Sequence, residues 1–136
     1  MQPPHLSLVL LSGRFAVCQL APRAVIPEWA QTGCFVSITR TNDELSIVCA
    51  EGAVPEGIKC ERGWRCLRVA GAMAFSVTGV LASLVSPLAA AQISVFAIAT
   101  FDTDYLLVKE DDLTASLAAL SKSGHSVNLG QPHGAT

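Results

Sequence analysis

The chain has 136 residues, 51% of them hydrophobic, and its nine basic and eleven acidic side chains give a net charge of −2. That much apolar material is enough to bury a core without disulfides or a metal, in one compact domain or two small modules. The charges are scattered, without a basic patch or basic–aromatic interleaving, so the electrostatic signature of nucleic-acid binding is missing and we expect no nucleic-acid partner.

The five cysteines predict neither a disulfide framework nor a metal site. Their number is odd, no pair has CxxC spacing, and three lie in apolar, strand-like runs, which favours buried free thiols. Cys60 and Cys66 flank a polar stretch and are the two that could pair or react, although no neighbouring residue visibly activates them. The three histidines complete no zinc-ligand spacing, so we expect no metal and no cofactor, and a reducing, cytoplasmic compartment.

The first half of the chain predicts short strands and very little helix. Two apolar runs, residues 6–11 and 15–20, are parted by a Ser-Gly-Arg turn, which predicts one bent strand or two short ones. Pro22 and Pro27 restrict any helix around residues 25–31 to a turn or two, because proline cannot continue a helix interior.

A hairpin and a junction follow. Residues 35–39 and 45–48 alternate apolar and polar side chains at period two, and the turn chemistry of Thr41-Asn42-Asp43-Glu44 separates them. Three turn-forming residues then mark a linker between modules: Gly52, Pro55 and Gly57.

The second half opens with a predicted strand over residues 64–71 and a longer helix. The helix is indicated by an apolar stripe at positions i, i+1, i+4, i+5 and i+8: Val80, Leu81, Leu84, Val85 and Leu88. Ser76 or Thr78 is a suitable cap for its start. Pro87 predicts a kink or tightened last turns, because it has no N–H to donate.

A second hairpin and a final helix complete the pattern. Residues 93–100 and 105–108 are strand-like and flank a polar turn, as in the first half. Asp111 or Asp112 then caps a helix over residues 113–122, which a glycine terminates.

Two apolar segments require a choice between membrane and interior. The run from Val69 to Phe101 carries no charge and is long enough to span a bilayer. Its polar interruptions and its change of periodicity favour a buried helix followed by a buried strand. The start of the chain, residues 1–11, lacks a basic beginning and a small-residue cleavage site, so we expect no signal peptide and no membrane association.

The two halves can be laid over each other without a gap at an offset of 60. This alignment has eight identities: Val9/Val69, Phe15/Phe75, Val17/Val77, Val25/Val85, Pro27/Pro87, Ala30/Ala90, Ile38/Ile98 and Val48/Val108. Both hairpins coincide in it, which predicts a duplicated strand–helix–strand–strand unit with an eroded first helix. The predicted modules are residues 1–57 and 58–126, followed by a disordered tail over residues 127–136.

Three segments of the second half resemble ACT domains. These are Trp64–Gly71, Phe75–Leu84 and, most closely, Ile93–Glu110, which is similar to the hairpin of small bacterial ACT-like proteins and of the related cytosolic arginine-sensor family. The resemblance implies an α+β, ferredoxin-like fold of βαββ units in tandem, with antiparallel sheets and helices on one face. It also implies amino-acid binding, commonly in a homodimer.

The resemblance places a ligand between the first strand-to-helix loop and the facing hairpin turn. The residues implied are Gly71, Ala72, Phe75, Ser76 and Gly79 from the loop, and Thr100, Phe101, Asp102 and Asp104 from the turn. Where we expect an acid in the loop, the sequence has Ala74, so a partner for a ligand ammonium group is lost there.

Elementary chemistry allows two roles for the same segments, ligand binding and ordinary structural support. A helix start flanked by glycines favours a carboxylate. Asp102 or Asp104 can hold an ammonium or guanidinium group, beside an apolar wall of Phe75 and Phe101. Glycines equally serve tight packing, and turn aspartates equally cap their own hairpin.

Three functional hypotheses follow. The first is a non-catalytic, regulatory protein that binds an amino acid or a similar small molecule as a homodimer. The alternative is a structural or protein-interaction ACT module that has lost its ligand. An enzyme is the weakest hypothesis, because no nucleophile or metal ligand converges on the two turn aspartates, Asp102 and Asp104, and we expect no catalytic residues.

Overall fold

The computed structural model describes residues 5–70 and 79–129, and the chain divides into two compact units. Unit 1 comprises Met1–Ser12 and Arg65–Thr136, and unit 2 comprises Gly13–Trp64. This division differs from the expected split after residue 57, because the N-terminal segment joins the second half of the chain.

Unit 2 is an antiparallel sheet in which β2 lies between β4 and the beginning of β5. β3 pairs with the other side of β4, so the predicted first hairpin is confirmed. The strands are β2 (Phe15–Leu20), β3 (Ser37–Arg40), β4 (Leu45–Ala50) and β5 (Cys60–Val69). A glycine with positive φ, Gly63, stands where the register of β2 and β5 shifts, as at a β-bulge.

The predicted helix of the first half is a single 3₁₀ turn, Glu28–Gln31, directly after Pro27. The two prolines had limited this segment to a turn or two, and the structure confirms it. The core of unit 2 is therefore formed mainly by strand residues on one sheet face, with Ala30 from that turn packed among them: Ala16, Cys18, Leu45, Ile47, Cys49 and Val54.

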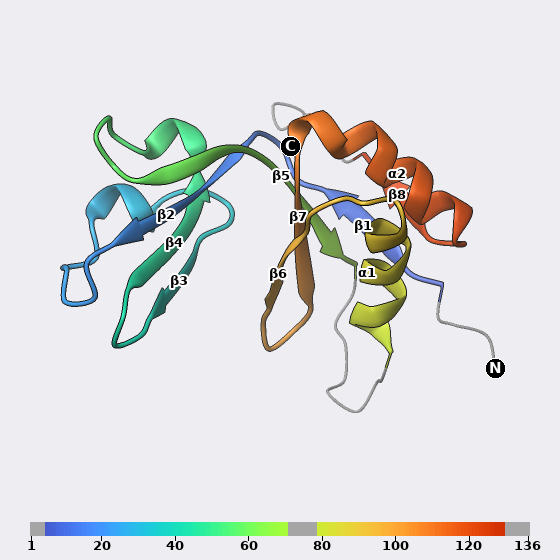
Figure 1. The fold of residues 1–136 in the computed structure, drawn as a ribbon, viewed down its shortest axis with the longest axis horizontal. Helices are drawn as coiled ribbons and strands as arrows, with labels where there is room; N and C mark the ends of the chain where they lie inside the picture. Colours follow the sequence, from blue (N-terminus) through green and yellow to red (C-terminus); the bar gives the residue numbers. More distant parts are fainter. Residues whose placement is uncertain (1–4, 71–78, 130–136) are drawn as a thin grey trace. The chain divides into compact units, whose positions relative to one another are not determined.

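Unit 1 contains the succession β5–α1–β6–β7–α2–β8, which is the βαββαβ order of a ferredoxin-like fold (Figure 1). Its sheet order is β6–β7–β5–β1–β8, so the N-terminal strand lies between β5 and β8. The remaining elements are β1 (Ser7–Leu10), α1 (Val80–Ala90), β6 (Phe96–Ala99), β7 (Asp104–Lys109), α2 (Leu113–Lys122) and β8 (Ser126–Asn128). The predicted α+β, ferredoxin-like class is confirmed.

The prediction of a disordered tail from residue 127 is wrong at its start, because the strand β8 extends to Asn128. Val127 and Asn128 belong to β8, which pairs in parallel with Leu8 and Val9 of β1. A three-residue strand with one apolar side chain has too little pattern to stand out from a polar tail, and its pairing is with a strand more than a hundred residues earlier. Residues 130–136 lie outside the described part of the chain.

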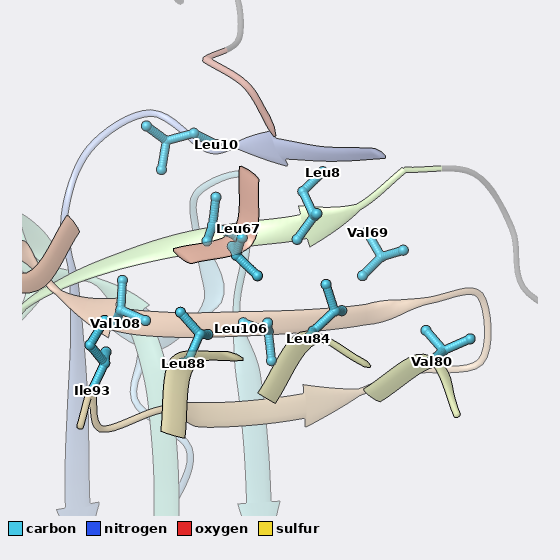
Figure 2. Close-up of a cluster of buried hydrophobic side chains, with 11 residues drawn as sticks. Leu8, Leu10, Leu67, Val69, Val80, Leu84, Leu88, Ile93, Leu106 and Val108 are labelled. Atoms are coloured by element: carbon cyan, nitrogen blue, oxygen red, sulfur yellow. The ribbon is translucent and has the colours of Figure 1, made fainter. Parts of the chain in front are cut away.

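Both helices of unit 1 pack on the same face of its sheet. Leu84 and Leu88 of α1 and Leu120 of α2 are fully buried in one cluster with residues of β1, β5 and β7, among them Leu8, Leu67, Val69, Leu106 and Val108 (Figure 2). Three members of the predicted stripe, Val80, Leu84 and Leu88, form the buried face of α1. The other two do not: Leu81 is 39% exposed and Val85 is half-buried, so the stripe is narrower than predicted. Burial of such a stripe, rather than helix propensity, stabilises a short helix of this kind.

The uncharged run Val69–Phe101 does not form one long helix. It contains the end of β5, the 11-residue helix α1 and the strand β6. Within residues 5–70 and 79–129, none of the helices combines the length and the apolar character needed to cross a bilayer.

The two hairpins correspond residue for residue, but not at the predicted offset of 60. Ser37 pairs with Val48 in the first hairpin and Phe96 with Leu107 in the second, so equivalent residues are 59 apart. Because side chains alternate across a sheet, a slip of one residue exchanges the two faces. The identity Val48/Val108 therefore joins residues on opposite faces of their strands.

Candidate functional site

The predicted site residues all belong to unit 1, but only part of the set lies in the described chain. Gly71, Ala72, Phe75 and Ser76 lie outside the described residues, as does the possible cap Thr78. The structure places the remaining members: Gly79, Thr100, Phe101, Asp102 and Asp104.

The β6–β7 turn is closed by Thr100. Its backbone N–H donates to the Thr103 carbonyl at 2.9 Å, and its hydroxyl donates to the same oxygen at 2.8 Å. The Thr103 N–H donates back to the Thr100 hydroxyl at 3.2 Å. A threonine at the first position of a turn competes well for these backbone groups, so Thr100 has a structural role that is independent of any ligand.

Thr103 is the residue that positions this turn, and the sequence-based site omits it. Its side chain is only 6% exposed, and its hydroxyl donates to the Val69 carbonyl at 2.8 Å. Val69 is the last residue of β5, so this buried bond holds the hairpin turn beside the end of the strand from which the loop to α1 departs. The sequence did contain a signal for this role, namely a second threonine three residues after Thr100 in a turn between two apolar strands.

The start of α1 lies at the same end of unit 1. Gly79 is the N-cap residue, with φ 77° and ψ 0°, a left-handed conformation that glycine adopts without strain. Val80, in the first turn, packs in the same core cluster as Val69, and both lie at the end of the core where β6 turns into β7 (Figure 2). The N-cap residue is therefore Gly79, which has no side chain to cap the helix, and not the predicted Ser76 or Thr78.

The turn presents polar and apolar groups outward. The side chain of Phe101 is 80% exposed, and Asp102 is also exposed. Asp104 is half-buried at the first position of β7, where it pairs with Ala99 of β6. One end of unit 1 therefore combines a helix N-terminus, two carboxylates and an aromatic ring.

Two arginines of β5 bind groups of the protein itself. Arg65 makes an ion pair with Glu110 at 3.0 Å, and Arg62 donates to the carbonyls of Glu51 and Val54 at 2.9 and 3.4 Å. The first contact lies in unit 1 and the second in unit 2.

The described His, Cys, Asp and Glu side chains form neither a cluster suited to a metal ion nor a disulfide. In the described ranges, no group of three or more His, Cys, Asp and Glu side chains is arranged to hold a metal ion. All five cysteines are free thiols. Cys60 and Cys66, which the sequence offered as a pair, lie six residues apart in the extended strand β5, about 20 Å by the usual rise of a strand, so they cannot bond to each other.

Family models match both parts of the chain. The model of the ACT domain matches residues 59–122, which run from the start of β5 to the end of α2. A second model, of an N-terminal domain, matches residues 13–57, which lie within unit 2.

Individual proteins support the same assignment. The cytosolic arginine sensor for mTORC1 subunit 1 of Homo sapiens is 38% identical over 60 residues, 43% of this chain, but the match spans only 18% of the sensor's length. The crystal structure of protein Atu0741 from Agrobacterium tumefaciens has a TM-score of 0.91 and 42% identity, covering 96% of this chain and 97% of that one. The regulatory subunit of aspartate kinase from Thermus thermophilus shares the fold, with a TM-score of 0.58 at 10% identity, covering 85% of this chain and 96% of that one.

Proposed function

This chain belongs to the ACT-domain family, and from that premise we propose that it is a non-catalytic regulatory protein that binds an amino acid in unit 1. The proposed contacts are the β6–β7 turn, with Thr100, Phe101, Asp102 and Asp104, and the glycine-led start of α1 at Gly79. The relative named above as an arginine sensor supports a ligand of this class.

One observation carries the proposal: the buried bond from the Thr103 hydroxyl to the Val69 carbonyl. It holds the turn at a constant position against the end of β5. Recognition of a small zwitterion needs such constancy, because a misplaced donor or acceptor loses most of its contribution.

The charges at this end of unit 1 suit the two ends of an amino acid. The N-terminus of α1 carries partial positive charge and unpaired N–H groups, which favour the ligand carboxylate. Asp102 and Asp104 provide carboxylates for an ammonium or guanidinium group, through charge-assisted hydrogen bonds. Phe101, which is 80% exposed, offers an apolar surface to the ligand side chain.

A non-catalytic role fits the chemistry of the same groups. General acid–base work needs a carboxylate that converges with a nucleophile or a second titratable group on one reacting atom. Asp102 is exposed to solvent on the turn, and Asp104 lies at a strand end, where it stands opposite Ala99. These surroundings favour binding a charge over transferring a proton.

The proposed homodimer follows from the exposed apolar groups of unit 1. Leu81 of α1 is 39% exposed, and β6 pairs with β7 alone among the described strands, which leaves one of its edges open. Open edges and exposed apolar residues are usually covered by a partner. Light scattering at micromolar concentration should give twice the chain mass, and a monomer across the concentration range would contradict the dimer.

The test of ligand binding is a thermal-shift screen of the purified protein against the twenty amino acids. A ligand that binds only the folded state stabilises it by about 2.7 kcal/mol when present at a hundred times its Kd. We expect one or two amino acids to raise the melting temperature. Asp102→Ala and Asp104→Ala should abolish that rise.

The chain contains its own control for these variants. Asp43 occupies the same position in the turn of unit 2 as Asp102 in the turn of unit 1, and it lies outside the proposed site. Asp43→Ala should keep the full ligand response. A flat response of the wild-type protein across the panel would reject the proposal and favour the alternative, an ACT module that acts through protein contacts alone.

A further inference from the structure

Three cysteines of unit 2 gather on one face of its sheet. Cys18 lies on β2, Cys49 on β4 and Cys60 at the beginning of β5, and all belong to the core cluster of the unit. The side chains of Cys18 and Cys49 are 2% and 0% exposed, whereas Cys60 is half-buried. Only one of the three thiols is therefore open to a small reagent from solvent.

Cys18 and Cys60 stand directly opposite each other on neighbouring antiparallel strands. The adjacent pair is hydrogen-bonded, with the Gln19 N–H donating to the Lys59 carbonyl at 3.0 Å. Hydrogen-bonded and non-hydrogen-bonded pairs alternate, so Cys18 and Cys60 form the close pair, with Cα atoms typically about 4.5 Å apart. That spacing lies within the range of roughly 4.4–6.8 Å that disulfides adopt.

The three thiols lie close enough together to perturb one another, because, besides burial, Cys49 and Cys60 both raise the pKa of the Cys18 thiol. Cys49 stands opposite Ala16 rather than Cys18, so it meets Cys18 only diagonally across the sheet. A bond between Cys18 and Cys60 therefore needs the smaller backbone movement.

We propose that Cys18 and Cys60 are a redox-sensitive pair that hydrogen peroxide closes into a cross-strand disulfide within unit 2. The inference is independent of the ligand site, which lies in unit 1. In the reduced protein all five thiols are free. The cross-link would tie β2 to β5 and enclose the β3–β4 hairpin.

The reaction balances in two steps. The thiolate of Cys60 attacks one peroxide oxygen, the O–O bond breaks, and hydroxide leaves and takes up a proton, which gives a sulfenic acid at Cys60 and one water. The sulfur of Cys18 then loses its proton and attacks the Cys60 sulfur, so that the S–S bond forms and the sulfenic hydroxyl leaves as a second water. In total, two thiols and one peroxide give one disulfide and two waters.

Burial decides the order of the two steps. Burial raises the pKa of the Cys18 thiol to about 12, so Cys18 stays protonated and is a poor first nucleophile. Cys60 is half-buried, whereas Cys18 and Cys49 are buried, so Cys60 is the thiol that peroxide can reach. The position of Cys18 directly opposite Cys60 compensates for its low thiolate fraction in the second step.

The test is peptide mapping of the full-length wild-type protein before and after hydrogen peroxide, with free thiols blocked under denaturing conditions. We expect one Cys18–Cys60 cross-linked peptide, a mass lower by two hydrogens, and full reversal by dithiothreitol. Closure should become faster as the pH rises, because Cys18 must lose its proton. Cys34→Ser is the matched control, since Cys34 is exposed and distant in sequence, and it should form the same cross-link.

Two variants distinguish a Cys18–Cys60 disulfide from other products of oxidation. Cys60→Ala should prevent the cross-link, and Cys18→Ala should leave a sulfenic acid at Cys60 that dimedone traps. A wild-type protein whose Cys60 is oxidised further to sulfinic acid without any cross-link would overturn the proposal. So would a cross-link of Cys60 to Cys49, because the geometry requires Cys18. The wild-type map decides the matter even if a buried substitution prevents folding.

Discussion

The β3–β4 hairpin of unit 2 and the β6–β7 hairpin of unit 1 have the same backbone pairing, but the fourth residue of the turn has a different role in each. Both begin the turn with a threonine, Thr41 or Thr100, whose N–H donates to the carbonyl three residues later at 2.9 Å. In both, the threonine hydroxyl accepts a backbone N–H from the far side of the turn. The strands on either side have the same lengths and pairing.

The fourth turn residue differs between the hairpins. In unit 2 it is Glu44, whose carboxylate accepts a hydrogen bond from the Gln19 side chain of β2 at 3.0 Å, on the surface. In unit 1 it is Thr103, whose hydroxyl bonds the Val69 backbone of β5 in the interior. Each residue reaches the strand beside its hairpin, but only Thr103 does so through a buried bond. The two hairpins therefore share one backbone pattern, but only the turn of unit 1, where the ligand is proposed, is anchored by a buried hydrogen bond.

The largest effect should come from the hairpin cores, where the two units are alike. Ile47 of β4 and Leu106 of β7 are equivalent and fully buried. Ile47→Ala and Leu106→Ala should each lower the free energy of unfolding by about 2–5 kcal/mol, through lost burial and a cavity. Urea denaturation measures both. A loss under about 1 kcal/mol at either position would show that the hairpins do not contribute equally to their cores.

A smaller effect should distinguish the two turns. Thr103→Val keeps the volume of the side chain but leaves the Val69 carbonyl without its donor, which should cost about 1–3 kcal/mol of unfolding free energy. Glu44→Gln keeps an acceptor on an exposed side chain and should cost less than about 0.5 kcal/mol. Comparable losses in urea denaturation would contradict the asymmetry between the turns. If Thr103→Val keeps its fold but loses the ligand response, the anchoring of the turn is needed for ligand recognition.

Much of the fold was predictable because it rests on local patterns. Period-two alternation predicted the first hairpin, and strand-like runs on either side of a polar turn predicted the second. The two prolines predicted the single 3₁₀ turn, and the apolar stripe predicted α1. The strand β8 was not predictable, because its pairing with β1 depends on a contact distant in sequence. The offset of 60 was wrong by one residue, since identities between apolar side chains do not reveal which face each occupies.

The sequence indicated the turn on which the candidate site is proposed, but not the residue that anchors this turn. Turn chemistry and resemblance indicated residues 100–104, but they emphasised the charged groups and omitted Thr103. Whether a threonine hydroxyl faces solvent or a neighbouring carbonyl depends on the strand packed beside it, which local sequence does not specify. The same holds for Cys18 and Cys60, which are paired by sheet topology over more than forty residues of chain.

The smallest effect concerns the glutamates that follow the two hairpins, Glu51 and Glu110. The Glu110 carboxylate makes an ion pair with Arg65 at 3.0 Å, whereas the Glu51 carboxylate accepts the Gly63 N–H at 2.8 Å. Glu110→Gln should lower the unfolding free energy by up to about 1 kcal/mol at low salt, because a partly exposed ion pair is lost. Glu51→Gln should cost less, since an amide oxygen accepts the same bond. Urea denaturation in 1 M salt, where the Debye length falls to about 3 Å, should remove most of the Glu110→Gln loss and leave that of Glu51→Gln unchanged. A salt response shared by both variants would mean that both glutamates act through charge, and the hairpins would then differ in the turn alone.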